Sequence, residues 1–236
     1  MELRILNKHT LKDYTSRERD NLILIDKPPD WTSFDVVKKI RNIGRFQKVG
    51  HGGTLDPFAT GLLVLGTGNY TSRLKAVIDA DKAYRGVIAF GEERDTYDLT
   101  GATIHATAIK SVDIDLIAQK VAELVGPSEQ IPPMFSAKKV GGQRMYKLAR
   151  KGVVVNRKPQ PIFVYTFDIT EFSATTISFY VVCSKGTYIR SLAHDIGSRS
   201  GYGAYLKALR RVSIGEFTVE NALTLDEFQH FWSTLN

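Results

Sequence analysis

The chain has 236 residues, 43% of them hydrophobic, which suits one sizeable core or at most two small ones. Lysine and arginine outnumber aspartate and glutamate by 32 to 25. The resulting net charge of +7 favours a polyanionic partner but does not distinguish RNA, DNA and membrane surfaces. The single cysteine, Cys183, excludes an intrachain disulfide framework and suits a reducing cytoplasm.

Residues 1–20 are polar, mixed in charge and weakly periodic, so we expect a loosely attached N-terminal arm. They contain no apolar segment typical of a signal peptide, and no apolar run in the chain approaches the length of a membrane span. The apolar run 21–25 predicts a buried strand. Thr32 and Asp35 have the spacing of a capping box, and helical periodicity follows them. We therefore expect a helix over about 33–43.

A glycine-rich stretch, Gly50–Gly61, leads into the apolar run 62–65, which predicts another buried strand. Its closely spaced glycines allow the backbone to approach a ligand, and His51 and Asp56 are its only ionisable side chains. Asp56 followed by Pro57 is also a favourable helix start, and helix capping is the commoner role for that pair. The whole stretch closely resembles the signature G-H-x-G-x-L-D-P-x-A-x-G of TruB-type tRNA pseudouridine synthases.

The next segments predict a hairpin and a helix. We expect strands at 82–90 and 102–108, separated by a polar loop over 91–98. The acidic residues of that loop fit no metal-binding spacing, and turn chemistry explains them equally well. Apolar residues at helical spacing predict a helix over 113–125, which Gly126-Pro127 would end.

Basic residues are concentrated between 130 and 158. The segment begins extended because of its prolines and continues into a short helix, with Gly152 as the expected C-cap. A solvated basic face is the alternative explanation. The segment also resembles a second TruB-family motif, P-P-x-[YF]-S-A-x-K followed by [LM]-Y-x-x-A-R-x-G, which belongs to an insertion that helps to hold RNA. The resemblance gives four candidates for RNA binding: Lys138, Arg144, Lys147 and Arg150.

The C-terminal third begins with Pro159 and Pro161, which predict an edge or a turn rather than a central strand. A strong strand follows at 176–183. The basic segment 206–211 is expected to lead into a further strand. A capping box predicts a last helix over 224–235.

The run Ser-Lys-Gly-Thr-Tyr-Ile-Arg at 184–190 is the third match to the TruB family. We expect Thr187 to cap a helix there, with Tyr188 and Arg190 in its first turn. A core tyrosine and a surface salt bridge are the ordinary roles for these two residues. An arginine in the first turn opposes the helix dipole, however, and an anionic partner would explain its position.

The resemblance extends over about residues 21–228 and rests on these three separate motifs. It implies the pseudouridine synthase fold, an α+β fold with a mixed, largely antiparallel central sheet flanked by helices and loops. We expect an arm over 1–20, a catalytic domain over 21–236 and an RNA-holding insertion over 130–158. Many relatives carry a further C-terminal RNA-binding PUA domain, and we expect none in this chain.

The resemblance also implies roles for individual residues. Asp56 matches the catalytic aspartate, and Arg190 matches the arginine that pairs with it. Tyr84 matches the tyrosine that packs on the target base and is a candidate for proton transfer. Tyr188 matches a pocket tyrosine, and His51 matches the histidine that enters the T-loop as the target uridine leaves.

Lys27 and Gly52 are two further positions of interest. Lys27, beside the proline-rich turn after the first strand, is a further candidate for substrate binding. Gly52 stands where the family usually has threonine after the histidine, and the extra glycine is expected to loosen the loop.

The implied activity is that of a tRNA pseudouridine(55) synthase, an isomerase that converts the T-loop uridine to pseudouridine with an active-site aspartate. The reaction exchanges an N–C for a C–C glycosidic bond without redox change, so we expect no metal and no cofactor. The sequence shows no metal-ligand or nucleotide-phosphate motif. A paired arginine would keep a shielded carboxylate ionised. Attack on the ribose, attack on the base and elimination to a glycal all remain open for Asp56.

The expected partner is the T-arm of tRNA. We expect no membrane association and no obligate protein partner, and a monomer in the cytoplasm. One alternative function is an RNA-binding or tRNA-folding protein on the same scaffold. Such a protein would not need Asp56, Tyr84, Tyr188 and Arg190 together. Another alternative is a pseudouridine synthase that acts on a different RNA.

Overall fold

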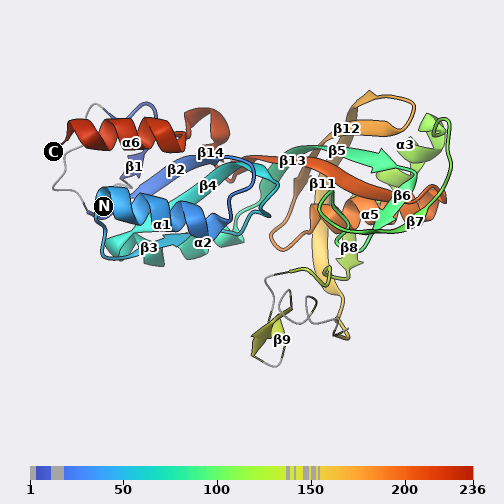
Figure 1. The fold of residues 1–236 in the computed structure, drawn as a ribbon, viewed down its shortest axis with the longest axis horizontal. Helices are drawn as coiled ribbons and strands as arrows, with labels where there is room; N and C mark the ends of the chain where they lie inside the picture. Colours follow the sequence, from blue (N-terminus) through green and yellow to red (C-terminus); the bar gives the residue numbers. More distant parts are fainter. Residues whose placement is uncertain are drawn as a thin grey trace. The chain divides into compact units, whose positions relative to one another are not determined.

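The computed structural model describes residues 4–11, 19–136, 139–140, 142–145, 149, 153 and 155–235, with the backbone alone at 139–140 and 143–144. The chain forms two compact units (Figure 1). The first contains Met1–Tyr84 and Arg210–Asn236, and the second contains Arg85–Leu209. Strands β5 (Lys82–Phe90) and β13 (Ala204–Ile214) each contribute residues to both units.

The first unit contains a mixed set of strands in the order β1-β2-β4-β13, with β3 paired to β4 and β14 paired to β13. Strand β2 runs antiparallel to β4, whereas the pairs β1–β2 and β13–β4 are parallel. The bounds of the other strands are β1 (Ile5–Leu6), β2 (Leu22–Lys27), β3 (Val49–His51), β4 (Thr60–Thr67) and β14 (Phe217–Thr218). Leu6 in β1 is only 1% exposed, so this part of the N-terminal segment is attached more firmly than a loose arm.

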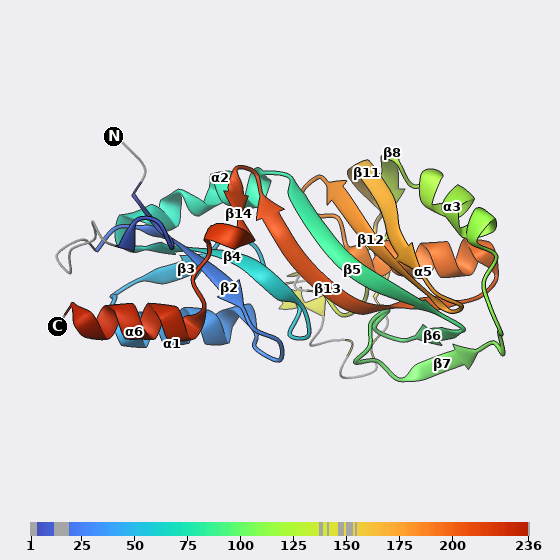
Figure 2. The same ribbon diagram turned by 90° about the horizontal axis from the view of Figure 1, so that it is seen from above.

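Helices cover both faces of β2 and β4 (Figure 2). On one face, alternate residues such as Ile23 and Leu63 pack against α1 (Ser33–Gly44) and α6 (Leu225–Thr234). On the other face, the intervening residues pack against the 3₁₀ helix η2 (Gly68–Ser72), α2 (Leu74–Asp79) and η3 (Val219–Asn221). Side chains alternate between the two faces of a strand, so a strand buried on both faces has a continuously apolar sequence. The apolar run 62–65 predicted such a strand, and β4 is one.

The two predicted capping boxes are confirmed. Thr32 accepts from the Asp35 amide at the start of α1, and Thr224 accepts from the Glu227 amide at the start of α6. In both cases the acidic side chain accepts in return from the backbone of the cap residue, so local sequence alone determines where these helices begin.

The second unit contains strands in the order β5-β12-β11-β8, together with a β6–β7 hairpin and a β9–β10 pair. The pairs of β11 with β8 and β12 are antiparallel. The helices α3 (Ile114–Ala122) and α5 (Ile189–Ser200) pack against each other. The bounds of the strands are β6 (Glu92–Arg94), β7 (Thr103–Ala106), β8 (Gly126–Gln130), β9 (Lys139–Val140), β10 (Gln143–Arg144), β11 (Gln160–Phe172) and β12 (Thr176–Cys183).

The fold class is confirmed as α+β with a mixed, largely antiparallel sheet. The predicted strands at 82–90 and 176–183 are also confirmed. Pro161 lies in β11 opposite Glu129 of β8, before the pairing with β12 begins at Val164. It therefore occupies a local edge, as its missing N–H requires.

Three local predictions need correction. The segment 91–98 is not all loop, because β6 pairs with β7 in a hairpin of their own. The helix predicted over 113–125 ends at Ala122, and Gly126 and Pro127 begin strand β8 instead. The basic segment 206–211 lies inside β13 rather than before it. The short helix expected before Gly152 lies largely outside the described residues. No helix in the described part of the chain is long and apolar enough to cross a membrane.

Candidate active site

The glycine-rich stretch forms a loop between β3 and β4 that carries Asp56. Its turn is closed by a hydrogen bond of 3.1 Å from the Ala59 amide to the Asp56 carbonyl. No helix begins there, so the helix-capping alternative for Asp56 is wrong. Asp56 is half-buried. Hydrogen bonds with three other elements hold the backbone of its loop.

Hydrogen bonds hold the loop backbone on both sides of Asp56. The Gly53 carbonyl accepts from Arg211 Nη2 at 3.2 Å, and the Leu55 amide donates to Ser33 Oγ at 2.9 Å. The Pro57 carbonyl accepts from Lys27 Nζ at 3.0 Å. These anchors come from β13, α1 and β2, so three separate elements determine where the carboxylate lies.

Lys27 has a different position from the one that substrate binding would require. Its side chain is 0% exposed, and Nζ donates to the carbonyls of Pro28, Trp31 and Pro57 at 2.8, 2.7 and 3.0 Å. An ammonium group has three N–H donors, so none remains for a phosphate. Burial lowers the pKa of Lys27 to about 8, against the opposing effect of the carboxylates of Asp30 and Asp56.

Arg211 is a second buried cation, at 2% exposure. Its Nε donates to the Leu62 carbonyl at 2.8 Å, and its guanidinium also makes a side-chain hydrogen bond with Tyr84. Burial lowers the pKa of Arg211, and Tyr84 acts in the opposite direction. Both Lys27 and Arg211 lie opposite Gly61 of β4 in the strand register.

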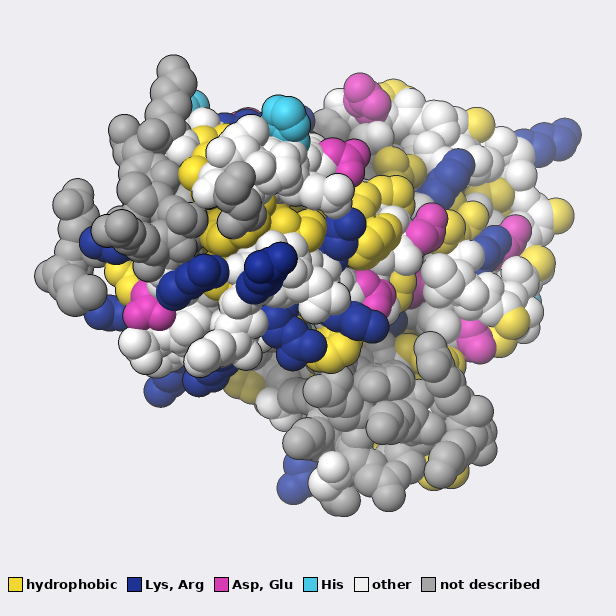
Figure 3. Space-filling model, turned by 60° about the vertical axis from the view of Figure 1, so that its left-hand side comes forward, with side chains coloured by type: hydrophobic (Ala, Val, Ile, Leu, Met, Phe, Trp, Pro, Cys, Tyr) yellow, Lys and Arg dark blue, Asp and Glu magenta, His cyan; other side chains and the backbone are white. Residues whose placement is uncertain are grey.

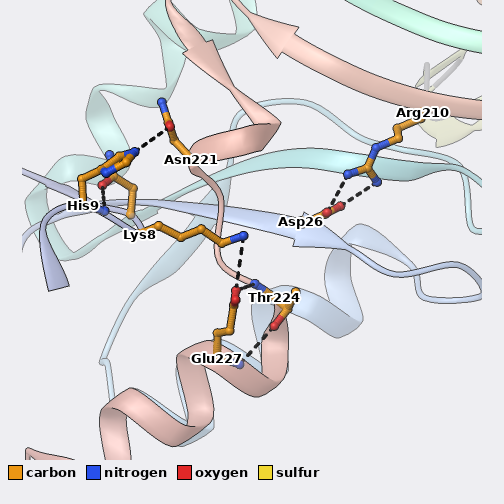
Figure 4. A network of polar contacts seen from close by, with 8 residues as sticks. Lys8, His9, Asp26, Arg210, Asn221, Thr224 and Glu227 are labelled. Atoms are coloured by element: carbon orange, nitrogen blue, oxygen red, sulfur yellow. Dashed lines mark hydrogen bonds and ion pairs between the residues drawn. The ribbon is translucent and has the colours of Figure 1, made fainter.

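The sequence interpretation placed Arg211 in a basic segment and missed its burial. A signal was present, because Arg211 lies two residues after the buried Leu209 and so shares its face of the strand. The neighbouring Arg210 points to the opposite face and forms a bidentate pair with Asp26, at 3.0 and 2.7 Å (Figure 4).

His51 and Tyr84 also belong to this unit. His51 ends β3, and its Nδ1 accepts from the Gly53 amide at 3.4 Å. Tyr84 lies in β5 and is 8% exposed. Figure 3 brings the first unit forward and shows Lys and Arg side chains gathered on this face. The exposed cations in or beside α1 are Lys38, Arg41, Arg45 and Lys48.

In the second unit, Arg190 lies in the first turn of α5, as predicted, and is 4% exposed. Its Nη1 donates to the Thr96 carbonyl at 3.0 Å, and its Nη2 donates to the Phe135 carbonyl at 2.8 Å. The Asp98 carboxylate lies 3.6 Å from Nη1. Asp98 was not identified from the sequence, because the acidic residues of its segment were explained by turn chemistry.

Tyr188 is the N-cap residue of α5, and its own side chain makes no capping hydrogen bond. Its amide donates to Gln130 Oε1 at 2.7 Å, and its carbonyl accepts from Gln130 Nε2 at 3.0 Å. The predicted capping by Thr187 is wrong, since its hydroxyl donates to the Ser184 carbonyl instead. The Gln130 amide therefore fixes the start of the helix that carries Arg190.

The candidate residues thus fall into both units, with Asp56, Tyr84 and His51 in the first and Arg190 and Tyr188 in the second. The pairing of Arg190 with Asp56 stays a prediction. Of the basic candidates in the insertion, Lys138, Lys147 and Arg150 lie outside the described residues, and Arg144 is described by its backbone in β10 alone. Among the residues that the structure describes, no group of three or more His, Cys, Asp or Glu side chains could hold a metal ion.

Comparison with known proteins places these residues in a family. The model for the TruB family pseudouridylate synthase N-terminal domain matches residues 41–189, and the model for the tRNA pseudouridylate synthase B C-terminal domain matches 190–235. The tRNA pseudouridine synthase B of Opitutus terrae is 41% identical over 213 residues, which cover 90% of this chain and 88% of that protein. The protein of the same name from Chlorobaculum tepidum is 42% identical over 214 residues, covering 89% of each.

Solved structures agree with this placement. A chain in a Cbf5-Nop10-Gar1 complex is 28% identical, with a TM-score of 0.70. A chain in an archaeal box H/ACA sRNP Nop10-Cbf5 complex is 29% identical, with a TM-score of 0.66. The present chain spans 59% and 54% of the lengths of these two chains. By its match to both family models and its identity with curated relatives, the chain belongs to the TruB family of pseudouridylate synthases.

Proposed function

We propose that the chain isomerises the T-loop uridine of tRNA, at position 55, to pseudouridine, with Asp56 as the catalytic carboxylate. The observation that carries the proposal is the anchored loop, in which Arg211, Ser33 and Lys27 hold the backbone around Asp56. A carboxylate on a fixed backbone is already oriented before substrate arrives, which reduces the entropy lost on reaching the reactive geometry. The names of the curated relatives support tRNA as the substrate.

The chemistry has defined requirements. The bond from ribose C1′ to N1 breaks, a bond from C1′ to C5 forms, one proton leaves C5, and one proton is gained at N1. A carboxylate is needed at the sugar or base, and Asp56 supplies it. A second group must take the C5 proton, and the phenol oxygen of Tyr84 is our candidate.

Arg190 is proposed to pair with Asp56 and to keep it ionised. Its planar guanidinium carries five N–H donors, so the same side chain can serve Asp98, two carbonyls and a further carboxylate. The contacts with Thr96, Phe135 and Asp98 hold the guanidinium in one orientation. Such a group stabilises developing negative charge without reorganising during the reaction.

RNA binding is proposed to use the exposed cations near α1 and the basic insertion that contains Lys138, Arg144, Lys147 and Arg150. Phosphate contacts position an RNA without reading its sequence. His51 and Tyr188 are proposed to contact the nucleotides around the extruded uridine. Extrusion costs a few kcal/mol, which stacking and hydrogen bonding in the site must offset.

The test is pseudouridine formation in a synthetic T-arm stem-loop, measured by chromatography and mass spectrometry of the digested RNA, with no metal or cofactor added. Wild type should form product and Asp56→Asn should form none while retaining the fold and RNA binding. Asp226→Asn, an exposed aspartate of α6, is the matched control and should be fully active.

Pseudouridine produced by Asp56→Asn would contradict the assigned carboxylate. If wild type bound both the stem-loop and full-length tRNA but modified neither, tRNA would not be the modified substrate. The RNA-folding function or another RNA substrate would then be favoured.

A further inference from the structure

Arg211 is a buried cation whose hydrogen bonds, among the residues that the structure describes, all go to uncharged groups. Its side chain is 2% exposed, and in the part of the chain that the structure describes it forms no ion pair. Removing a guanidinium from water without a carboxylate partner is unfavourable for stability. An apolar residue would avoid this cost, so the hydrogen bonds of the guanidinium must account for its presence.

The guanidinium connects three elements. It donates to the Leu62 carbonyl in β4, to the Gly53 carbonyl in the Asp56 loop and to the Tyr84 side chain in β5. Arginine has no acceptor, so it must donate to the Tyr84 phenol oxygen, and the phenol's own proton must point elsewhere. The positive charge also stabilises the ionised phenolate relative to the neutral phenol.

Two glycines of the signature stretch make this arrangement possible. Gly61 lies opposite Arg211 in the parallel pairing of β4 with β13, and a Cβ at Gly61 would lie 2.3 Å from the Arg211 carbonyl oxygen. Gly53 has a φ of +130°, a conformation that favours glycine, and its carbonyl lies within reach of the guanidinium. The signature glycines therefore bring the backbone close enough for one side chain to hold both the loop and the tyrosine.

We propose that Arg211 is a positioning residue for the isomerisation, one that holds the Tyr84 phenol oxygen and the Asp56 loop in a fixed relation. The inference rests on the proposed function and deepens it. The Tyr84 phenolate takes the proton from C5, the electrons of the C–H bond return to the uracil ring, and N1 takes up a proton from water. Tyr84 then releases its proton to water before the next turnover.

Arg211→Lys tests the proposal, with Arg210→Lys as the matched control. Lysine keeps the charge but cannot direct donors at three separated acceptors. We expect the single-turnover rate of Arg211→Lys to fall about tenfold or more, with RNA affinity changed by no more than about twofold. The rise in rate with pH that reports formation of the phenolate should also move to higher pH, because a less well-held charge stabilises the phenolate less. Arg210→Lys, on the opposite face, should leave both the rate and the pH profile unchanged.

Tyr84→Phe distinguishes positioning from a purely structural role. It removes the phenol oxygen but leaves Arg211 and its two carbonyl contacts in place. In the Tyr84→Phe background, Arg211→Lys should cause a smaller loss of rate than in wild type, since the contact with the phenol oxygen is already gone and only the loop contact remains to be lost. If Arg211→Lys fails to fold, the pH profile of Tyr84→Phe decides, and retention of the wild-type rise in rate with pH would overturn the inference.

The two proposals fail in different ways. If wild type forms no pseudouridine, the proposed function is wrong. If wild type is active and Arg211→Lys has a wild-type rate and pH profile, the proposed function stands and the role of Arg211 is wrong.

Discussion

The guanidinium of Arg190 and the carboxylate of Asp98 form a buried pair, with 3.6 Å between Nη1 and Oδ2 and side-chain exposures of 4% and 5%. The other oxygen of Asp98 accepts from Thr96 Oγ1 at 2.8 Å and from the Thr100 amide at 2.9 Å. One oxygen of the Asp98 carboxylate therefore accepts hydrogen bonds within the turn, and the other faces Arg190. The pair holds Arg190 at the first turn of α5 before any substrate binds.

Asp98→Asn should keep the turn contacts and remove the charge that faces Arg190. Removing one partner of a buried ion pair is destabilising, so we expect the free energy of unfolding to fall by about 3 kcal/mol. Urea denaturation measures this loss. Asp95→Asn is the control, because Asp95 is exposed and accepts from the Ala102 amide. Equal unfolding midpoints for the two variants would show that the pair contributes little.

Arg190→Lys should lower single-turnover pseudouridine formation by roughly a hundredfold, since lysine cannot reproduce the directed donors that orient a carboxylate. The matched control is Arg199→Lys, an exposed arginine in the last turn of the same helix, which should remain near wild-type activity. Near-normal turnover by Arg190→Lys would mean that its proposed pairing with Asp56 is absent or unimportant.

The lowered pKa of Lys27 predicts that the free energy of unfolding depends on pH. Its pKa is lowered from 10.5 to about 8 in the folded chain, so between these values the unfolded chain binds more protons. Stability should therefore rise with pH over that window, by roughly 3 kcal/mol at most, and this term should be constant below pH 8. Other groups titrate over the same range, so the quantity to measure is the difference from a variant without this amine.

Chemical denaturation of wild type and Lys27→Met at pH 7 and pH 10 measures that difference. We expect the stability of wild type relative to Lys27→Met to increase between the two pH values. Lys207→Met removes an exposed lysine of β13 and should show no such change relative to wild type. A pH-independent difference for Lys27→Met would indicate that Lys27 keeps an ordinary pKa.

Gly61→Ala should be strongly destabilising for two reasons. Gly61 has a φ of +101°, and a Cβ there would lie 2.3 Å from the Arg211 carbonyl oxygen. We expect a loss of more than about 3 kcal/mol in unfolding free energy, or failure to fold. Gly186→Ala is the control, because Gly186 has a φ of +81° and open space around it. It should lose only about 1 kcal/mol from backbone strain, and a similar loss in both variants would show that β13 can move away from β4.

Local interactions made much of this protein predictable from sequence alone. The capping boxes at Thr32 and Thr224 act over three residues, and the apolar run 62–65 specifies a strand that is buried on both faces. The signature stretch singled out Asp56 as a candidate, and the Ser-Lys-Gly-Thr-Tyr-Ile-Arg run predicted Arg190 in a first helical turn, where the structure has it. These features depend on side-chain spacing along a single segment, which the sequence displays directly.

Tertiary structure alone decided what the buried cations do. Lys27 and Arg211 are far apart in the chain, yet both lie opposite Gly61 because β4 pairs with β2 on one side and with β13 on the other. Only that strand order turns two basic residues away from phosphate and toward the carbonyls that flank Asp56. Composition counts both as positive charge, but whether a cation meets RNA or anchors a loop depends on which backbone acceptors the fold brings within about 3 Å of it.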